Sequence, residues 1–317
     1  MGSCKPGYGR EELCGSELWV RIGAGGFWME RLFLREKTEE PVFSVPQRVK
    51  IGVVGAARGA GASFAAGAVA KVLSLDKKRR VSLAEILLSA AAEKPRPERE
   101  NEMPGKTRKE KTASSSGRFI GHKPLLYDSL GMDRRFAGRD FVRFYKLIKD
   151  GCDIRGLTNV DERINWVLPT PEDTDGGLLT ETDALRLVNN IPGDIVVCDL
   201  PSGTAGALAS DADILICVID PLPSRLLAAE EYIEEIKKLE AAGKRLIWLV
   251  NKYNSGINKR ELAAFLRLRE TAQFPLIPGE ILCNAEYTCR LPCSIREVNE
   301  LLRGEVEKII LRHKIFT

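Results

Sequence analysis

A glycine- and alanine-rich stretch, GAARGAGAS at residues 55–63, has the composition of a phosphate-binding loop. It follows the apolar run VKIGVV and precedes SFAAGAVAKVLSL, which has the spacing and alanine content of a packed helix. Glycine lets backbone N–H groups approach phosphate oxygens closely, and the N-terminus of the following helix attracts negative charge. The stretch therefore predicts a nucleotide-phosphate site, with a simple strand-to-helix turn as the alternative.

The loop lacks the lysine that normally stands directly before the Ser or Thr, because Ala62 precedes Ser63. In working loops this lysine contacts the β- and γ-phosphates, while the hydroxyl holds Mg²⁺. Arg58 is the only basic residue in the loop, and we expect it to face solvent. Binding through backbone N–H groups is still expected, but rapid hydrolysis is not, since phosphoryl transfer depends on such charges.

Two later segments carry residue types that complete a nucleotide site. GDIVVCDLPSG ends a buried strand at Asp199, where a carboxylate can reach a magnesium ion, and LVNKYNSGINKREL places Asn251 and Lys252 at the end of another strand. The carboxyl ends of parallel strands face one crevice of an open sheet, which is where ligands bind. The order of these features predicts that they meet at one edge of the sheet.

Taken together, residues from about 48 to 312 resemble the ParA/MinD family of deviant Walker ATPases. The family's loop reads KGGVGKT. Against that pattern Ala57 stands at the signature lysine that reaches across a dimer, Ala62 at the second lysine and Ser63 at the threonine. DLPSG is similar to the family's DTPPG. Where the family's second strand ends in an aspartate that helps to place the attacking water, SLAEI offers Glu85.

The resemblance implies ATP and Mg²⁺ as ligands, a homodimer, and protein partners in a larger assembly. It places Ser63 and Asp199 on Mg²⁺ and Asn251 near the adenine, and it gives Glu85 and Asp199 the catalytic roles if the protein is active. The implied nucleotide-binding residues are Gly55, Arg58, Gly59, Ala60, Gly61, Ala62, Ser63, Phe64, Asn251 and Lys252. The altered loop is also similar to that of the TadZ/CpaE pilus-assembly proteins, although 46 N-terminal residues are too few for their receiver-like domain.

An alternation of apolar strands and helices must hold these residues in place. Strands are expected at RRVSLAEI, RINWVLPTPED, DIVVCDL, DILICVID, RLIWLVNK and FPLIPGE, and helices at LLTETDALRLVNNI, RLLAAEEYIEEIKKLEAAG, KRELAAFLRL and SIREVNELLRGEVEKIILR. Continuous apolar strands between helices require a parallel sheet covered on both faces. We predict an α/β fold with a doubly wound, mostly parallel sheet of the P-loop NTPase type.

Composition divides the chain into an N-terminal extension of unassigned role at residues 1–46 and a domain at 47–317. A charged, proline-containing insertion at about 93–118 has almost no large apolar residues and predicts a flexible segment. Acids are interspersed among its bases, which favours a solvated linker over a DNA-binding tail. A net charge of +4 gives no separate reason to expect DNA.

Eight cysteines without disulfide spacing predict reduced thiols and a cytoplasmic protein. The spacing of Cys283, Cys289 and Cys293 fits no zinc or iron–sulfur pattern, so no metal cluster is expected. The apolar stripe of the last helix predicts packing on the sheet, with peripheral membrane contact as the alternative.

The function predicted from these features is a degenerate ParA/MinD-like protein that serves as a scaffold or a positioning and regulatory factor with weak or no ATP hydrolysis. The first alternative is a slow ATPase in pilus or secretion assembly, in which Arg58 or a partner's residue supplies the missing charge. The second is a partitioning protein that contacts DNA or membrane through residues 106–118 or the last helix.

Overall fold

The computed structural model describes residues 48–89, 125–175, 178–268 and 270–312. The expected N-terminal extension at 1–46 and the charged insertion at about 93–118 lie outside these ranges, so the proposed domain division stays a prediction.

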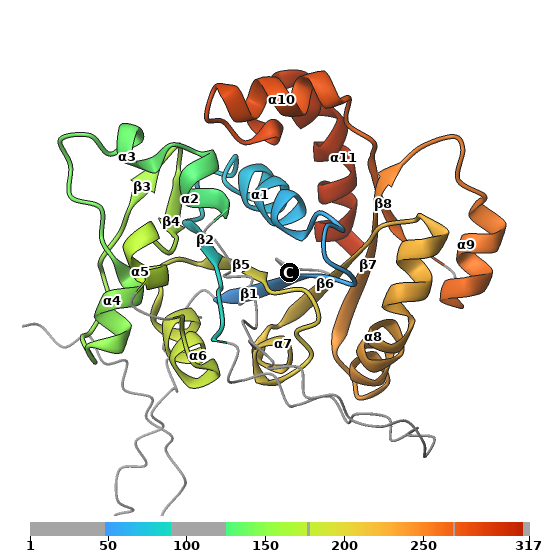
Figure 1. The fold of residues 1–317 in the computed structure, drawn as a ribbon, viewed down its shortest axis with the longest axis horizontal. Helices are drawn as coiled ribbons and strands as arrows, with labels where there is room; N and C mark the ends of the chain where they lie inside the picture. Colours follow the sequence, from blue (N-terminus) through green and yellow to red (C-terminus); the bar gives the residue numbers. More distant parts are fainter. Residues whose placement is uncertain (1–47, 90–124, 176–177, 269, 313–317) are drawn as a thin grey trace, which may run out of the picture. The chain divides into compact units, whose positions relative to one another are not determined.

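The described part of the chain contains an eight-stranded sheet (Figure 1). The strand order is β3-β4-β2-β5-β1-β6-β7-β8, and every neighbouring pair is parallel except β3 with β4. This confirms the predicted doubly wound, mostly parallel sheet. The strands are β1 (Val49–Gly55), β2 (Val81–Glu85), β3 (Val160–Asp161), β4 (Ile164–Val167), β5 (Ile195–Leu200), β6 (Ile214–Ile219), β7 (Arg245–Tyr253) and β8 (Ala272–Pro275).

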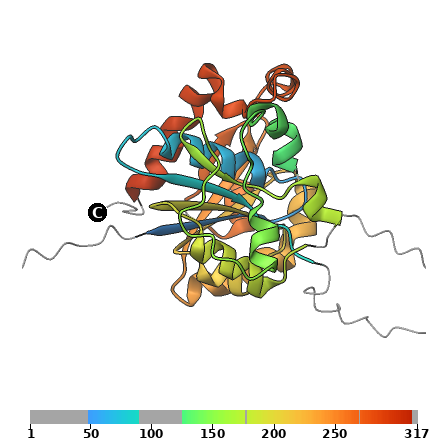
Figure 2. The ribbon, with the colours of Figure 1, turned by 90° about the vertical axis from the view of Figure 1, so that its left-hand side faces the viewer.

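Helices cover both faces of the sheet (Figure 1, Figure 2). One face carries α1 (Ala62–Leu73), α2 (Leu125–Ser129), α3 (Met132–Arg135), α10 (Gly279–Tyr287), the 3₁₀ turn η2 (Pro292–Ser294) and α11 (Arg296–Arg312). The other carries α4 (Phe144–Lys149), α6 (Glu181–Asn190), α7 (Ala207–Asp211), α8 (Pro223–Ala241) and α9 (Lys259–Leu266), while α5 (Pro171–Asp175) follows β4. Alternate residues of each central strand enter the two apolar cores, because successive side chains of a strand point to opposite faces.

Local signals explain several element boundaries. Thr180 caps α6 by accepting a hydrogen bond from the N–H of Asp183. Gly243 follows the end of α8 with a left-handed φ of 93°. The strand predicted at FPLIPGE is shorter than expected, because β8 ends at Pro275 and α10 begins at Gly279.

The last helix packs as predicted. The side chains of Val298, Leu302, Val306 and Ile309 are buried in the core on the α1 side of the sheet. These four side chains therefore face the protein interior. In the described residues no helix combines the length and apolar character needed to cross a membrane.

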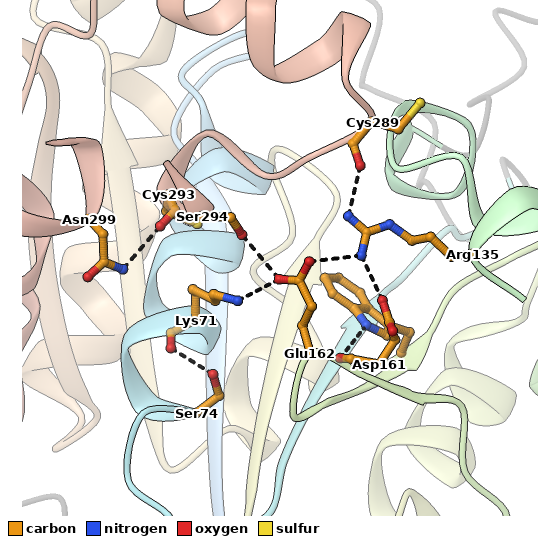
Figure 3. A network of polar contacts seen from close by, with 10 residues as sticks. Lys71, Ser74, Arg135, Asp161, Glu162, Cys289, Cys293, Ser294 and Asn299 are labelled. Atoms are coloured by element: carbon orange, nitrogen blue, oxygen red, sulfur yellow. Dashed lines mark hydrogen bonds and ion pairs between the residues drawn. The ribbon is translucent and has the colours of Figure 1, made fainter. Parts of the chain in front are cut away.

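A network of ion pairs joins this helical layer to the β3–β4 edge (Figure 3). Glu162 lies in the tight turn between β3 and β4, and its carboxylate accepts from Lys71 of α1 at 2.6 Å and from Arg135 of α3 at 3.2 Å. Arg135 also donates to Asp161 at 2.7 Å and to the carbonyl oxygen of Cys289 at 2.8 Å. The network therefore connects segments that are far apart in sequence.

Candidate nucleotide site

The glycine loop joins β1 to α1, and two of its glycines adopt a left-handed backbone. Gly59 and Gly61 have φ values of 81° and 94°, in the left-handed region that favours glycine. The N–H of Ala56 donates to Val218 of β6 at 2.8 Å, and the N–H of Ala60 donates to Ala57 at 3.1 Å. The first contact joins the start of the loop to β6, and the second forms a turn within the loop.

The first turn of α1 offers unpaired backbone donors. Among the described residues, no acceptor lies at hydrogen-bond distance from the N–H groups of Ala62, Ser63 or Phe64. This is the normal state of a helix N-terminus, and Gly61 at the cap has no side chain that could accept from them. Three donors and the helix dipole are therefore available to an anion.

Asp199 lies at the carboxyl end of β5, between the loop strand and β2. It is opposite Val53 of β1 and Glu85 of β2 in the parallel register, and it is only 6% exposed. Burial raises the pKa of the Asp199 carboxyl to about 7, although its hydrogen bond with the Ser63 hydroxyl acts in the opposite direction. Near neutral pH this group is therefore partly protonated, and a bound cation would compete with the proton.

Glu85 contacts α2 through its carboxylate and α4 through its backbone carbonyl. One of its carboxylate oxygens accepts from the backbone N–H of Leu126 at the start of α2, at 3.2 Å. The hydroxyl of Tyr145 donates to the Glu85 carbonyl at 2.6 Å and accepts from the N–H of Leu87 at 2.9 Å. The end of β2 is therefore bonded to α2 through the Glu85 carboxylate and to Tyr145 of α4 through its backbone.

Asn251 and Lys252, at the end of β7, contact the backbone of the loop. The Asn251 amide nitrogen donates to the carbonyl of Ala60 at 2.8 Å, and the Lys252 ammonium donates to the carbonyl of Gly59 at 3.0 Å. Lys252 also forms an ion pair of 2.7 Å with Asp220, which follows β6. The Asn251 amide that we expected near the adenine is therefore bonded to the loop itself.

Of the predicted nucleotide and metal residues, Asn251 and Lys252 contact the glycine loop, and Ser63 lies near Asp199. Arg58 is exposed, as expected, and the side chain of Phe64 packs edge-on against Phe274, so only its backbone N–H faces the site. Sequence reasoning missed Asp220, which is 5% exposed and binds Lys252. The signal was present, because VIDP places an aspartate directly after a buried strand in the same way as CDLP does.

The residues present are of the types that a magnesium–nucleotide complex requires. The N–H groups of the first turn of α1 can donate to a phosphate, and the Ser63 hydroxyl and the Asp199 carboxylate are ligand types that Mg²⁺ uses. Asp199 and Asp220 are both buried here, and Lys252 is already paired with Asp220. A triphosphate would therefore need a divalent cation to offset this negative charge.

The C-terminal cysteines do not form a further site in the described residues, where no group of three or more His, Cys, Asp or Glu side chains is arranged to hold a metal ion. Cys283 is exposed, Cys289 is half-buried and Cys293 is buried.

Comparison with known proteins identifies the fold. No protein-family model and no curated protein matches the sequence. A putative plasmid partition protein from Borrelia burgdorferi bound to AMPPNP matches with a TM-score of 0.56 and 13% identity, over 84% of this chain and 100% of that one. The MinC:MinD cell division protein complex of Aquifex aeolicus matches with a TM-score of 0.56 and 12% identity over 83% and 95% of the two chains.

A ParA family ATPase from Chlorobium tepidum matches with a TM-score of 0.52 and 16% identity, over 84% of this chain and 98% of that one. The chain therefore has the fold of the ParA/MinD ATPases, as the sequence resemblance implied. At these identities the likeness concerns the fold alone.

Proposed function

We propose that this protein binds a nucleoside triphosphate with Mg²⁺ and acts as a positioning or regulatory scaffold with weak or no hydrolysis. One observation carries the proposal. The loop keeps the left-handed glycines and unpaired N–H groups of a phosphate cradle, yet alanine occupies both positions where the resemblance expects lysine, Ala57 and Ala62.

In this proposal the N–H groups of Ala62, Ser63 and Phe64 bind the phosphates, and the Ser63 hydroxyl and Asp199 hold Mg²⁺. When bound, Mg²⁺ supplies positive charge to the phosphate oxygens. Lys252 binds Asp220 and the loop carbonyl of Gly59, so it does not replace the loop lysines in this arrangement. Hydrolysis is slow because the charge that develops on the transferred phosphoryl group has few cations to stabilise it.

A homodimer, a cytoplasmic location and protein partners complete the proposal. The MinC:MinD complex supports the idea that this fold presents a surface to a partner protein. Work in a pilus or secretion machine of the TadZ/CpaE kind is one form of this role.

The exposed Arg58 supports a second candidate, a slow ATPase. An exposed guanidinium on the loop can reach a phosphate within the site or in a second copy of the chain. Measurable turnover that disappears in Arg58→Ala would favour this candidate over the inactive scaffold.

The first experiment is calorimetric titration of the full chain with ATP, with and without Mg²⁺, alongside a phosphate-release assay over many hours. Magnesium-dependent binding with little or no phosphate release is the expected result. If ATP does not bind with or without Mg²⁺, the loop is only a strand-to-helix turn and the proposed nucleotide role is wrong.

A further inference from the structure

Three residues outside the glycine loop contact it or support those contacts: Asn251, Lys252 and Asp220. We propose that they form a loop clamp, a set of positioning residues that keeps the loop's carbonyl groups turned toward β7 and its N–H groups turned toward the ligand. The clamp is a property of the nucleotide-free protein, and only its effect on nucleotide affinity rests on the proposed function.

The first contact is buried and direct. Asn251 is 5% exposed, and its amide nitrogen donates to the Ala60 carbonyl at 2.8 Å across 191 residues of sequence. The fit is close, because a Cβ atom at Gly61 would lie 2.2 Å from that nitrogen. A buried donor bonded to a buried carbonyl is costly to separate, since neither group then has a partner.

The second contact is an ionic bridge. The Lys252 ammonium lies 3.0 Å from the Gly59 carbonyl and 2.7 Å from a carboxylate oxygen of Asp220. The other Asp220 oxygen accepts from the N–H of Leu222, just before α8. A continuous chain of contacts therefore runs from the start of α8 through Asp220 and Lys252 to the loop.

The backbone of β7 is distorted where the two β7 residues of the clamp occur. Lys252 has a φ of 55°, which is rare outside glycine, and the pairing of β7 with β8 shifts register between Val250 and Tyr253. A bulge of this kind redirects side chains, and a left-handed lysine persists only where its surroundings hold it. The redirected side chains here are the two that reach the loop.

The clamp has a geometric consequence for ligand binding. In a trans peptide the C=O and the following N–H point in opposite directions, and no described peptide bond is cis. Because Asn251 holds the Ala60 carbonyl, the N–H of Gly61 must point away from Asn251. A loop without lysines binds phosphate through such N–H groups, so their orientation matters more here than in a loop that also supplies charge.

The test is hydrogen–deuterium exchange on the nucleotide-free full chain, measured over peptides that cover residues 56–66. The reporters are the N–H groups of Ala60 and Ala65, which bond to Ala57 and Gly61. Asn251→Ala and Lys252→Met should each raise exchange there by about five- to tenfold, the effect of losing one hydrogen bond. Lys252→Arg should keep the wild-type rate, because a guanidinium can also donate to both partners.

Asn254→Ala is the matched control. Asn254 lies three residues beyond Asn251, and among the described residues its side chain bonds to the backbone of Lys252 and Gly256 and forms no hydrogen bond with the glycine loop. It should leave exchange in the loop unchanged. Circular dichroism and thermal melting establish that each variant is folded, and Lys252→Met is the safer variant because its side chain is 41% exposed.

Unchanged loop exchange in folded Asn251→Ala and Lys252→Met would overturn the clamp, and so would a Lys252→Arg variant that behaves like Lys252→Met. Titration with Mg·ATP separates the two proposals. Faster loop exchange together with a five- to tenfold weaker affinity supports both. Faster exchange in a protein whose wild type binds no ATP supports the clamp and rejects the nucleotide role.

Discussion

Glu85 and Asp199 are register partners on the neighbouring parallel strands β2 and β5, and both carboxyl groups are buried, at 3% and 6% exposure. Their surroundings differ: Glu85 accepts from the N–H of Leu126, whereas burial raises the pKa of Asp199 and the nearby Ser63 hydroxyl acts in the opposite direction. The glycine loop that follows the adjacent strand β1 contains no lysine.

Asp199→Asn should stabilise the folded protein at alkaline pH. The pKa of Asp199 is raised to about 7, chiefly by burial, whereas an aspartate in the unfolded chain ionises near pH 4. Wild-type stability is therefore lost progressively as pH rises from about 4 to 7 and stays lower above that range, since the unfolded chain binds fewer protons. The variant avoids this loss.

Urea denaturation at pH 5 and pH 8 measures the effect. The variant should exceed the wild type by an amount on the order of 2–4 kcal/mol at pH 8, with a smaller gap at pH 5. Asp128→Asn, which alters an exposed carboxylate, is the control. A gap that is equal at both pH values would show that Asp199 does not titrate as described.

Gly61→Ala should destabilise the protein more than Gly59→Ala. Both glycines have left-handed φ values, so alanine is strained at either site, by about 1–2 kcal/mol. A Cβ at Gly61 also meets the Asn251 amide at 2.2 Å, whereas a Cβ at Gly59 has no neighbour within 4 Å. The difference in unfolding free energy between the two variants isolates the Asn251 contact, and equal losses would contradict it.

Ala62→Lys should tighten ATP binding. Ala62 is the first residue of α1 and stands where the family resemblance expects the second lysine, so a lysine there would add a cation at the proposed phosphate site. An affinity gain of about tenfold or more is expected from one added charge–phosphate contact. Calorimetric titration with Mg·ATP measures it.

The control for that gain is Ala207→Lys, which adds the same charge at the exposed first residue of α7. Both variants place a cation at a helix N-terminus, where the helix dipole repels positive charge. If they bind ATP equally, the loop is not the phosphate site.

Glu162→Gln should destabilise the protein at neutral pH but not in acid. Partial burial raises the pKa of Glu162, yet its bonds to Lys71 and Arg135 outweigh that effect, so the pKa is lowered below the ordinary value of 4.5. The contribution of Glu162 to stability is present above pH 4.5 and disappears as pH falls through the lowered pKa.

The expected loss at pH 7 is about 1 kcal/mol, because the Glu162 side chain is 37% exposed and solvent screens the pairs. Chemical denaturation at pH 7 and pH 3 measures it. Glu172→Gln breaks a pair with Arg143 in which the glutamate is 72% exposed, and it should cost less. A loss for Glu162→Gln that does not shrink between pH 7 and pH 3 would point to packing rather than charge.

Much of the scaffold follows from local patterns in the chain. Runs such as DIVVCDL and DILICVID have no polar alternation and can be stable only as strands buried on both faces, which predicts a parallel sheet between helix layers. Thr180 sets the start of α6, and Gly59 and Gly61 mark the left-handed positions of the loop. The short strand β3 and the early end of β8 were not predicted, because both depend on pairing with a neighbouring strand.

The relations between distant groups were decided only by the tertiary structure. Strand order places Asp199 of β5 beside Glu85 of β2, and a bulge in β7 turns Lys252 toward both Gly59 and Asp220. The sequence contains each of these residues at the end of an apolar strand, but spacing along the chain does not determine which strand ends become neighbours. The strand order of the folded sheet decides which strand ends become neighbours. It therefore determines which residues of the site contact one another and how deeply they are buried.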